Sequence, residues 1–475
     1  MINKVRNICC IGAGYVGGPT MAVFADKCPN INIFVVDKNK QRVNAWNSED
    51  LTKLPIFERG LDKLISKRRG KNLHFSDNFK KYISEADMIF ISVNTPTKTK
   101  GLGAGKASDL KWVEASSREI AEYAQGETIV VEKSTLPVKT AQTIKSILDE
   151  SQSINKDKKF TVLSNPEFLA EGSAIADLEF PDRVLIGGDN LESIKALVNI
   201  YLNWIPKDKI ITTDLWSSEL SKLTANAFLA QRISSINSIS ALCERTGANI
   251  KDVSLAIGTD KRIGKEFLNA GPGFGGSCFK KDILNLVYIY DYYGLHNEAK
   301  YWEKVVEIND WQKKRISNLI IEKLFGTVSG KKIAILGFSF KANTNDTRES
   351  PAISICKELI NEGGNLFVYD PKVSHEQIRI DLNLPEARQE QDLNEGGWSY
   401  ATSIFEAIKS SDAIVIITEW EEFKYLNWKE IKSKMRNPSW IFDTRLIINI
   451  SEAEKYGLKV WSVGKGSQNI SHFKL

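Results

Sequence analysis

The chain has 475 residues, of which 42% are hydrophobic and 26% charged, as in ordinary globular proteins. That length exceeds what a single hydrophobic core usually supports, and it predicts two or three domains. The 64 basic and 59 acidic residues are interspersed and leave a net charge of +5, which does not favour a nucleic-acid partner. There is no apolar run long enough to span a bilayer and no signal-peptide pattern at the N-terminus, so we expect a cytoplasmic protein without membrane association.

The spacing of cysteine and histidine argues against metal or disulfide chemistry. The six cysteines form no C-x-x-C pair, and the four histidines lie far apart in the sequence. We therefore expect neither a disulfide framework nor a metal cofactor.

Residues 5–42 carry the strongest local pattern. A short apolar strand over residues 5–11 is followed by a G-x-G-x-x-G turn, a helical segment at 19–25 and a second strand over 33–37. Asp37 ends that strand 20 residues after Gly17, the spacing that places a carboxylate on the adenosine ribose of NAD and repels the extra phosphate of NADP. The pattern predicts an NAD site formed by Gly12, Ala13, Gly14, Tyr15, Val16, Gly17 and Asp37, with Arg42 close by.

Three further apolar strands, at residues 86–93, 128–132 and 160–163, each end in a polar turn. These turns contain Asn94, Thr95, Pro96 and Thr97, then Ser134 and Thr135, and then the segment SNPEFLAEG at 164–172. Because ligands bind at the carboxyl ends of strands in doubly wound sheets, the turns are candidate ligand contacts. The alternatives are ordinary loop chemistry and, for Glu167 and Glu171, a helix cap. A strand at 183–188 completes a first domain that we expect to end near residue 212.

Residues 216–245 contain neither glycine nor proline, and their apolar side chains recur at helical spacing. This pattern predicts one long helix of the kind that links domains. Lys222 and Asn226 lie one turn apart on it, and the alternative interpretation is that they occupy a solvated face.

The segment GFGGSC at 273–278 is a glycine-rich turn followed by an apolar run that reads as a helix. Cys278 would then lie at a helix N-terminus beside two lysines, where the positive field lowers a thiol pKa. Asp282 would share its helix face, so a nucleophile and a carboxylate could address one substrate. The alternative is an inert, buried cysteine.

A second α/β unit begins at residues 332–337 and continues with strands at 366–370, 413–418 and 440–443. Its glycine pattern is incomplete, so we expect this unit to bind a different nucleotide or none. Residues 385–399 are rich in Glu, Gln and Asn, and we expect them to form a solvated excursion, that is, a solvent-exposed loop. The expected fold is α/β, with two Rossmann-like doubly wound parallel sheets joined by a long central helix and a small helical domain. The expected domains are 1–212, 213–323 and 324–475.

The glycine fingerprint, the SNPEFLAEG segment, the helix with Lys222 and Asn226, and the GFGGSC turn together resemble the nucleotide-sugar 6-dehydrogenases. Within them the likeness is strongest to the UDP-glucose 6-dehydrogenases, and it runs to about residue 445. The resemblance implies an enzyme that oxidises UDP-glucose to UDP-glucuronate with two NAD. Dehydrogenation of another nucleotide sugar, GDP-mannose or a UDP-N-acetyl amino sugar, is the nearest alternative, and a non-catalytic nucleotide-sugar sensor is a more distant one.

The resemblance also implies roles for individual residues. Cys278 matches the nucleophile that forms a thiohemiacetal and then a thioester, and Lys222 matches the group that stabilises charge on oxygen or moves protons. Asp282 matches the residue that orients that lysine or a water, while the other matched positions of the catalytic site are Glu167, Thr135 and Asn226.

The matched binding positions form two sets. The cofactor positions are Gly12, Ala13, Gly14, Tyr15, Val16, Gly17, Asp37, Arg42, Val93, Asn94, Thr95, Pro96, Thr97, Ser134, Thr135, Glu171, Cys278, Lys281 and Arg348. The substrate positions are Glu167, Phe168, Leu169, Ala170, Glu171, Lys222, Asn226, Arg262, Asn269, Phe274, Gly275, Phe279, Phe340, Lys341 and Arg445. Asn269 stands where animal members tend to have lysine, and the family equivalent of Arg262 reaches into a neighbouring subunit, which implies at least a dimer.

Overall fold

The computed structural model describes residues 5–134, 139–384, 386 and 395–466. The chain forms two compact units: unit 1 comprises residues 1–226 with 284–296, and unit 2 comprises residues 227–283 with 297–475. None of the described helices is both long enough and apolar enough to cross a membrane.

Unit 1 is built on an eight-stranded sheet in the order β3-β2-β1-β4-β5-β6-β7-β8. Its strands are β1 (Asn7–Ile11), β2 (Asn32–Val36), β3 (Leu73–Ser76), β4 (Met88–Ile91), β5 (Glu127–Glu132), β6 (Lys159–Ser164), β7 (Val184–Gly188) and β8 (Ile210–Thr213). All pairings are parallel except that of β6 with β7. Strand order reverses between β1 and β4, and in doubly wound sheets this switch point is where ligands bind.

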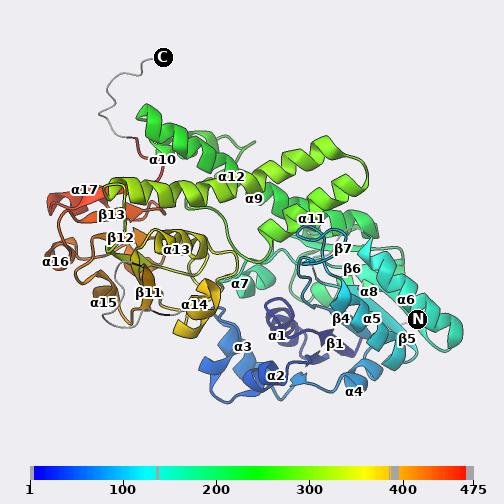
Figure 1. The fold of residues 1–475 in the computed structure, drawn as a ribbon. Coiled ribbons are helices and arrows are strands. Elements are labelled where there is room, and N and C mark those ends of the chain that lie inside the picture. The colour runs from blue at the N-terminus through cyan, green and yellow to red at the C-terminus, as the bar shows by residue number, and fades with distance from the viewer. Residues whose placement is uncertain (1–4, 135–138, 385, 387–394, 467–475) are drawn as a thin grey trace. The chain divides into compact units, whose positions relative to one another are not determined.

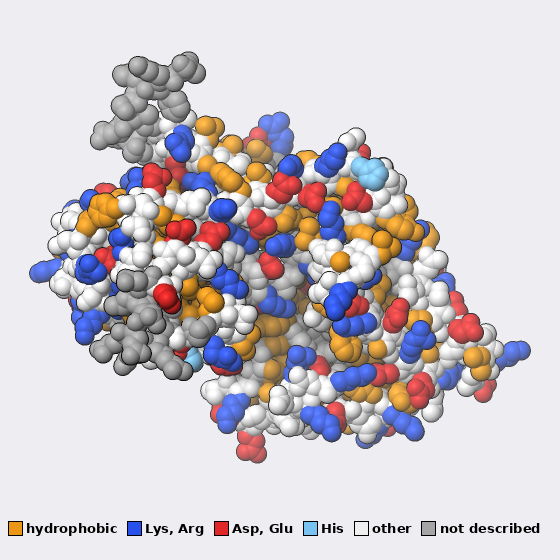
Figure 2. Space-filling model, in the orientation of Figure 1, with side chains coloured by type: hydrophobic (Ala, Val, Ile, Leu, Met, Phe, Trp, Pro, Cys, Tyr) orange, Lys and Arg blue, Asp and Glu red, His pale blue; other side chains and the backbone are white. Residues whose placement is uncertain are grey.

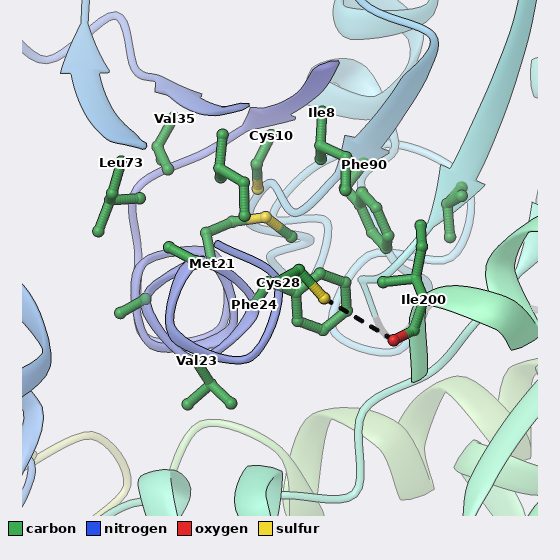
Figure 3. Close-up of a cluster of buried hydrophobic side chains, with 14 of the residues drawn as sticks. Ile8, Cys10, Met21, Val23, Phe24, Cys28, Val35, Leu73, Phe90 and Ile200 are labelled. Atoms are coloured by element: carbon green, nitrogen blue, oxygen red, sulfur yellow. Dashed lines mark hydrogen bonds between the residues drawn. The ribbon is translucent and has the colours of Figure 1, made fainter. Parts of the chain in front are cut away.

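Helices cover both faces of this sheet. They are α1 (Gly17–Lys27), α2 (Lys40–Asn47), α3 (Leu61–Arg68), α4 (Phe79–Ser84), α5 (Lys111–Tyr123), α6 (Thr140–Ile154), α7 (Ala174–Glu179) and α8 (Leu191–Tyr201), with short 3-10 turns at Leu51–Lys53 and Lys207–Lys209. Because side chains alternate along a strand, Ile8 and Cys10 of β1 enter the core beneath α1, whereas Cys9 and Ile11 enter the core on the opposite face. Figure 3 shows the first of these cores, with Met21 and Phe24 of α1 directed at the strands. Helices α5 and α6 lie side by side on the other face (Figure 1).

Unit 2 contains a six-stranded, wholly parallel sheet in the order β11-β10-β9-β12-β13-β14. Its strands are β9 (Lys332–Leu336), β10 (Asn365–Tyr369), β11 (Gly397–Tyr400), β12 (Ala413–Ile416), β13 (Trp440–Asp443) and β14 (Lys459–Ser462). Around it lie α13 (Pro351–Asn361), α14 (His375–Leu382), α15 (Ile404–Ile408), α16 (Trp428–Lys434) and α17 (Ile450–Lys455), with a 3-10 turn at Glu421–Phe423. Numbered from β9, the order is 3-2-1-4-5-6, which is the order of dinucleotide-binding sheets.

The remaining helices are α9 (Leu215–Thr246), α10 (Ile250–Gly258), α11 (Phe279–Tyr292) and α12 (His296–Lys323). Helices α9 and α11 contribute residues to both units. The predicted long helix is therefore confirmed, at 32 residues and about 48 Å for a rise of 1.5 Å per residue.

The predicted fold class is confirmed, with one local correction and one difference. Residues 385–399 are not a solvated excursion throughout, because β11 begins at Gly397 and Trp398 is fully buried in the unit 2 core; residues 385 and 387–394 lie outside the described part. In addition, β7 runs antiparallel to β6, where a parallel sheet was expected. On the face drawn in Figure 2, basic and acidic side chains are interspersed, in keeping with the small net charge.

Candidate active site

The turn after β1 has the geometry of a dinucleotide cradle. Gly12 adopts φ +109°, and a Cβ there would lie 2.2 Å from the carbonyl oxygen of Ser92. A Cβ on Gly17 would lie 2.0 Å from the Gly12 oxygen, so both glycines are required by packing within the protein. Around Gly14, in contrast, a Cβ would meet no atom within 4 Å. The open space at Gly14 is where the backbone can approach a ligand closely.

The residues around this turn fit NAD. Helix α1 begins at Gly17 with no acidic residue in its first turn, so its N-terminus presents N–H groups and a positive dipole end to an anion such as a pyrophosphate. Trp46 supports the turn from within, since its indole N–H donates to the Ala13 carbonyl at 2.9 Å.

Asp37 lies just beyond β2 and is 8% exposed. Its Oδ2 accepts the Ala13 N–H at 2.9 Å and the Arg42 guanidinium at 3.0 Å, and its Oδ1 accepts the Asn39 N–H at 2.8 Å. These bonds hold the carboxylate at the end of β2, the position from which it can accept ribose hydroxyls.

The next predicted turns lie beyond β4 and β5. Val93, Asn94, Thr95, Pro96 and Thr97 follow β4 directly, with Asn94 exposed and Thr95 buried. Ser134 Oγ donates to the Val93 carbonyl at 2.8 Å, which joins the two turns. Thr135 lies outside the described residues.

Beyond β6, the SNPEFLAEG segment meets the predicted lysine of α9. Lys222 Nζ lies 3.3 Å from Glu167 Oε1, and both side chains are only 5% exposed. Glu167 Oε2 accepts the Leu169 N–H at 3.1 Å. The Phe168 ring lies 3.8 Å from the Arg183 guanidinium and 5.4 Å from Lys222 Nζ. The interpretation that Lys222 and Asn226 occupy a solvated face is wrong, because they are 4% and 6% exposed.

A cavity of about 130 Å³ adjoins this ion pair within unit 1. Its lining includes Glu167, Phe168 and Leu169 of the predicted site and Asn165 of the same segment, together with Lys133 and Tyr201, which were not predicted site residues. Lys133 Nζ donates to Asn165 Oδ1 at 3.0 Å and lies 3.3 Å from the Tyr201 hydroxyl. Burial lowers the pKa of Lys133 to about 8. The charge of Glu167 opposes this shift, and that of Lys222 adds to it.

Two predicted positions lie later in the SNPEFLAEG segment. Ala170 is exposed, and Glu171 is half-buried.

In unit 2, buried amides hold the glycine-rich turn before Cys278. Asn309 of α12 accepts the Phe274 N–H at 2.7 Å and donates to the Phe274 carbonyl at 3.1 Å. Gly275 cannot carry a side chain, since its Cβ would lie 2.7 Å from Phe340 Cβ. The Gly276 N–H donates to the Arg348 carbonyl at 2.8 Å. The turn is thereby fixed against the segment that carries Phe340 and Arg348.

Cys278 immediately precedes helix α11, so it lies at the helix N-terminus, as predicted. The helix begins at Phe279, and its first turn closes with the Asp282 N–H donating to the Cys278 carbonyl at 2.8 Å. Cys278 is partly exposed and its thiol lies 3.4 Å from Ser277 Oγ, so the cysteine is not buried, as the alternative interpretation required. One turn further, Asp282 is 1% exposed, with Lys281 Nζ at 3.5 Å from Oδ1. The edge of the Phe274 ring meets Phe279, with ring centroids 5.7 Å apart.

The other predicted positions of unit 2 divide into two groups. Arg445 donates to the carbonyls of Ile417 and Phe340, at 2.6 and 2.9 Å, and Lys341 Nζ lies 5.6 Å from the Phe340 ring centroid, so these three predicted residues lie together. Arg262 and Asn269 are exposed. The Arg262 guanidinium pairs with Asp260.

Each unit thus brings together its own share of the predicted positions. Unit 1 gathers the cofactor turn with Asp37, and separately the Glu167–Lys222 pair with Phe168. Unit 2 gathers the Cys278 turn with Asp282, Phe340 and Arg348. These groups are a dinucleotide cradle, a buried lysine–carboxylate pair and a cysteine at a helix N-terminus, and such groups can serve hydride transfer and nucleophilic catalysis.

Comparisons with known proteins agree with this chemistry. Residues 6–205, 216–311 and 334–450 match the NAD binding, central and UDP binding domains of the UDP-glucose/GDP-mannose dehydrogenase family. UDP-glucose 6-dehydrogenase 4 of Arabidopsis thaliana is 54% identical over 470 residues, covering 96% of this chain and 97% of the relative. UDP-glucose 6-dehydrogenase 1 of Glycine max is 53% identical with the same coverage.

Solved structures show the same fold. A UDP-glucose dehydrogenase from Pyrobaculum islandicum has a TM-score of 0.82 at 26% identity, covering 97% of this chain and 98% of that one. A UDP-D-ManNAc dehydrogenase from Pyrococcus horikoshii has a TM-score of 0.79 at 25% identity, covering 97% and 99%. The chain belongs to the UDP-glucose/GDP-mannose dehydrogenase family.

Proposed function

We propose that the protein oxidises C6 of UDP-glucose to the carboxylate, giving UDP-glucuronate and two NADH. The observation that carries this proposal is the 54% identity, over 96% of the chain, to a UDP-glucose 6-dehydrogenase. The cradle at Gly14 and the acid at Asp37 support NAD as the cofactor, which would accept one hydride in each of two oxidations.

Cys278 is the proposed nucleophile. After the first oxidation its sulfur adds to the C6 aldehyde, forming a C–S bond and a thiohemiacetal. This tetrahedral carbon retains one hydrogen, which leaves as the second hydride and gives a thioester. Water then displaces the thiol and forms the acid. The sequence needs a sulfur that solvent and substrate can reach, and the partly exposed position of Cys278 at a helix N-terminus supports that assignment.

The remaining roles follow from charge and burial. Lys222 would stabilise negative charge on the C6 oxygen, a contribution of about 3 kcal/mol by analogy with one oxyanion-hole donor. Glu167 and Thr135 would bind the water that hydrolyses the thioester and accept or donate its protons. The Glu167 carboxylate suits this role because it is buried and paired with Lys222. Asp282 would orient Lys222 or a water, and Asn226 would bind the substrate.

For the binding residues, we infer that the matched cofactor and substrate positions act as in the family. The chemistry of Phe340, Lys341 and Arg445 suits a nucleotide, since one aromatic ring and two cations lie within one cluster. The matching of family domains also supports three functional domains at residues 1–212, 213–323 and 324–475.

Self-association is a further part of the proposal. In unit 2, several large apolar side chains of α9, α10 and α12 are exposed: Phe228, Leu242, Leu255 and Trp311. Arg262 is also solvent-exposed, which suits a contact with a neighbouring subunit. We infer at least a dimer, to be measured by light scattering. A cytoplasmic location is inferred from six cysteines that form no disulfide.

The stoichiometry of NADH tests the function. Purified protein with excess NAD should release two NADH per UDP-glucose consumed, measured by absorbance and by chromatography of the acid. One NADH per sugar, or none, would contradict the four-electron reaction. The same assay on a UDP-N-acetyl amino sugar and on GDP-mannose tests the alternative, for which the Pyrococcus horikoshii likeness is the supporting observation.

Replacement of the nucleophile tests the covalent mechanism. Cys278→Ala should lower kcat by at least about 1,000-fold, because no tetrahedral carbon forms for the second oxidation. NAD affinity should stay within about twofold of the parent, because the cradle is intact. The matched control is Cys243→Ala, a cysteine that is buried elsewhere in unit 2. Near-normal glucuronate formation by Cys278→Ala would rule the mechanism out.

A further inference from the structure

Lys133 is a buried lysine of unit 1 for which the described residues provide no ion-pair partner. It follows β5 directly and is 3% exposed. Among the described residues, no carboxylate lies within ion-pair distance of its Nζ, whereas the nearby Lys222 pairs with Glu167 at 3.3 Å. A buried ammonium group normally requires such a partner, because removing a charge from water is costly.

The hydrogen bonds of Lys133 suit a neutral amine. Its Nζ donates to Asn165 Oδ1 at 3.0 Å and to the Tyr201 hydroxyl oxygen at 3.3 Å, and Tyr201 itself donates to Asn165 Oδ1 at 2.6 Å. The two acceptors take the two hydrogens of an NH₂ group. The lone pair of that group then remains available to bind a proton.

The charged groups around Lys133 come from several elements. Glu167 and Lys222 act on it electrostatically, as does the Cys10 thiol, whose pKa is raised by burial so that it stays neutral. Burial also raises the pKa of the Tyr201 hydroxyl, which stays neutral as well. The same cavity is lined by Asp177, Asp182 and Arg183. Glu132 belongs to the opposite face of the sheet, where it hydrogen-bonds to Glu219.

The cavity leaves room for water beside Lys133 and Glu167. Both residues line it, and its volume of about 130 Å³ can hold several water molecules. Oxidation of an alcohol by NAD releases one proton for every hydride transferred. That proton needs an acceptor on the protein side of the reacting oxygen.

We propose that Lys133 is the internal proton acceptor of the reaction, taking up through cavity water the proton that the substrate hydroxyl passes to the Glu167–Lys222 pair. In this step the hydroxyl O–H and the C6–H bond break, the hydride reduces NAD, and the amine becomes an ammonium group. Lys133 acts through the pair and does not touch the substrate, so it is a positioning residue. This inference depends on the proposed function.

Because the pKa of Lys133 lies at about 8, its neutral form grows from about a tenth to about nine tenths of the molecules between pH 7 and pH 9. The kcat of the parent protein should therefore rise about tenfold over this range. In Lys133→Met the rise should vanish, leaving a loss of about tenfold at pH 9 and little loss at pH 7. Lys133→Arg, which keeps its charge, should not restore the rise.

Stability provides a readout that needs no turnover. A charged Lys133 disfavours the folded state, so this penalty is complete below pH 8 and disappears as pH approaches the unfolded value near 10.4. The Tm of the parent should therefore rise relative to Lys133→Met between pH 8 and pH 10. The control is Lys158→Met, which removes a lysine that donates to the backbone carbonyls of Ala121 and Glu122.

The experiments distinguish a failure of the proposed function from a failure of the role proposed for Lys133. If the parent protein forms no NADH from UDP-glucose, the proposed function fails before any variant is compared. If the parent is active and Lys133→Met keeps both its rate and its pH profile, the proton-acceptor role is overturned. A loss of activity that is equal at all pH values, or that Lys133→Arg restores, would reduce Lys133 to a structural residue.

Discussion

In both sheets the first strand is followed by a turn that begins with glycine, but the two turns have different roles. In unit 1, β1 is followed by Gly12, Ala13 and Gly14, and in unit 2, β9 is followed by Gly337, Phe338 and Ser339. The first glycine of each turn has a positive φ, +109° and +93°, and no room for a Cβ. In both sheets an aspartate at the end of the second strand accepts from the turn: Asp37 accepts the Ala13 N–H, and Asp370 accepts the Phe338 and Ser339 N–H groups.

The difference lies in what fills the turn. Gly14 faces open space, whereas Ser339, at the same position of the second turn, is fully buried, and so is Phe338. Asp370 Oδ2 accepts the Phe338 and Ser339 N–H groups at 2.7 and 3.0 Å and the Trp420 indole N–H at 3.1 Å. Its other oxygen accepts two more backbone N–H groups. The protein itself satisfies this carboxylate, so the second turn supports the sheet and the first is left for a ligand.

Filling the open turn should have the largest effect. Gly14→Val places a side chain where the pyrophosphate approaches, and NAD affinity should fall by about 100-fold or more, which is roughly 3 kcal/mol. Stability to urea should be unchanged, because a Cβ there meets nothing within 4 Å. Calorimetric titration with NAD measures the first quantity and an unfolding curve the second. Tight NAD binding by Gly14→Val would show that the cradle is not the cofactor site.

Replacing Asp370, the aspartate of the unit 2 sheet, should lower the stability of the protein without changing NAD affinity. Asp370→Ala leaves several buried N–H groups without an acceptor, and the free energy of unfolding should drop by about 3–5 kcal/mol. The dissociation constant for NAD, measured below the unfolding transition, should stay within about twofold. A clear loss of NAD affinity would mean that the second sheet also contributes to the cofactor site.

The matching substitution in the first sheet is Asp37→Ala. It should reduce stability less than Asp370→Ala does, and it should change the preference for NAD over NADP. Asp37→Ala should weaken NAD by about tenfold and reduce discrimination against NADP, since the carboxylate no longer holds the ribose or repels the 2′-phosphate. Its cost in unfolding free energy should be about 1 kcal/mol, because fewer donors lose their acceptor. Initial rates with both cofactors give the preference, and an unchanged NADP to NAD ratio would remove Asp37 from that role.

The sequence predicted the framework of both sheets because their central strands are uninterrupted apolar runs. Strand β13 was predicted with its observed bounds, and α9 within one residue at each end. The strands β3, β8 and β14 were missed, since each is four residues long and carries polar or charged side chains. Trp398 was misassigned for a related reason, because its strand follows a segment rich in Glu, Gln and Asn.

The cavity beside Glu167 could not be predicted in the same way. Lys133, Asn165 and Tyr201 lie 32 and 36 residues apart along the chain and meet only when β5, β6 and α8 pack together. A lysine after an apolar strand is expected at the surface, because few lysines are fully buried. The segment SNPEFLAEG drew attention to Glu167, but nothing in it signals the buried amine that faces the same cavity.

The exposure of the cysteines has a practical consequence for thiol reagents. Cys278 alone among the six is not buried. Burial raises the pKa of Cys28 to about 11 and also raises the pKa values of Cys9, Cys10, Cys243 and Cys356. A mild alkylating agent should therefore modify one sulfur per chain in the native protein. Counting that adduct by mass spectrometry would measure the fraction of competent molecules in a preparation.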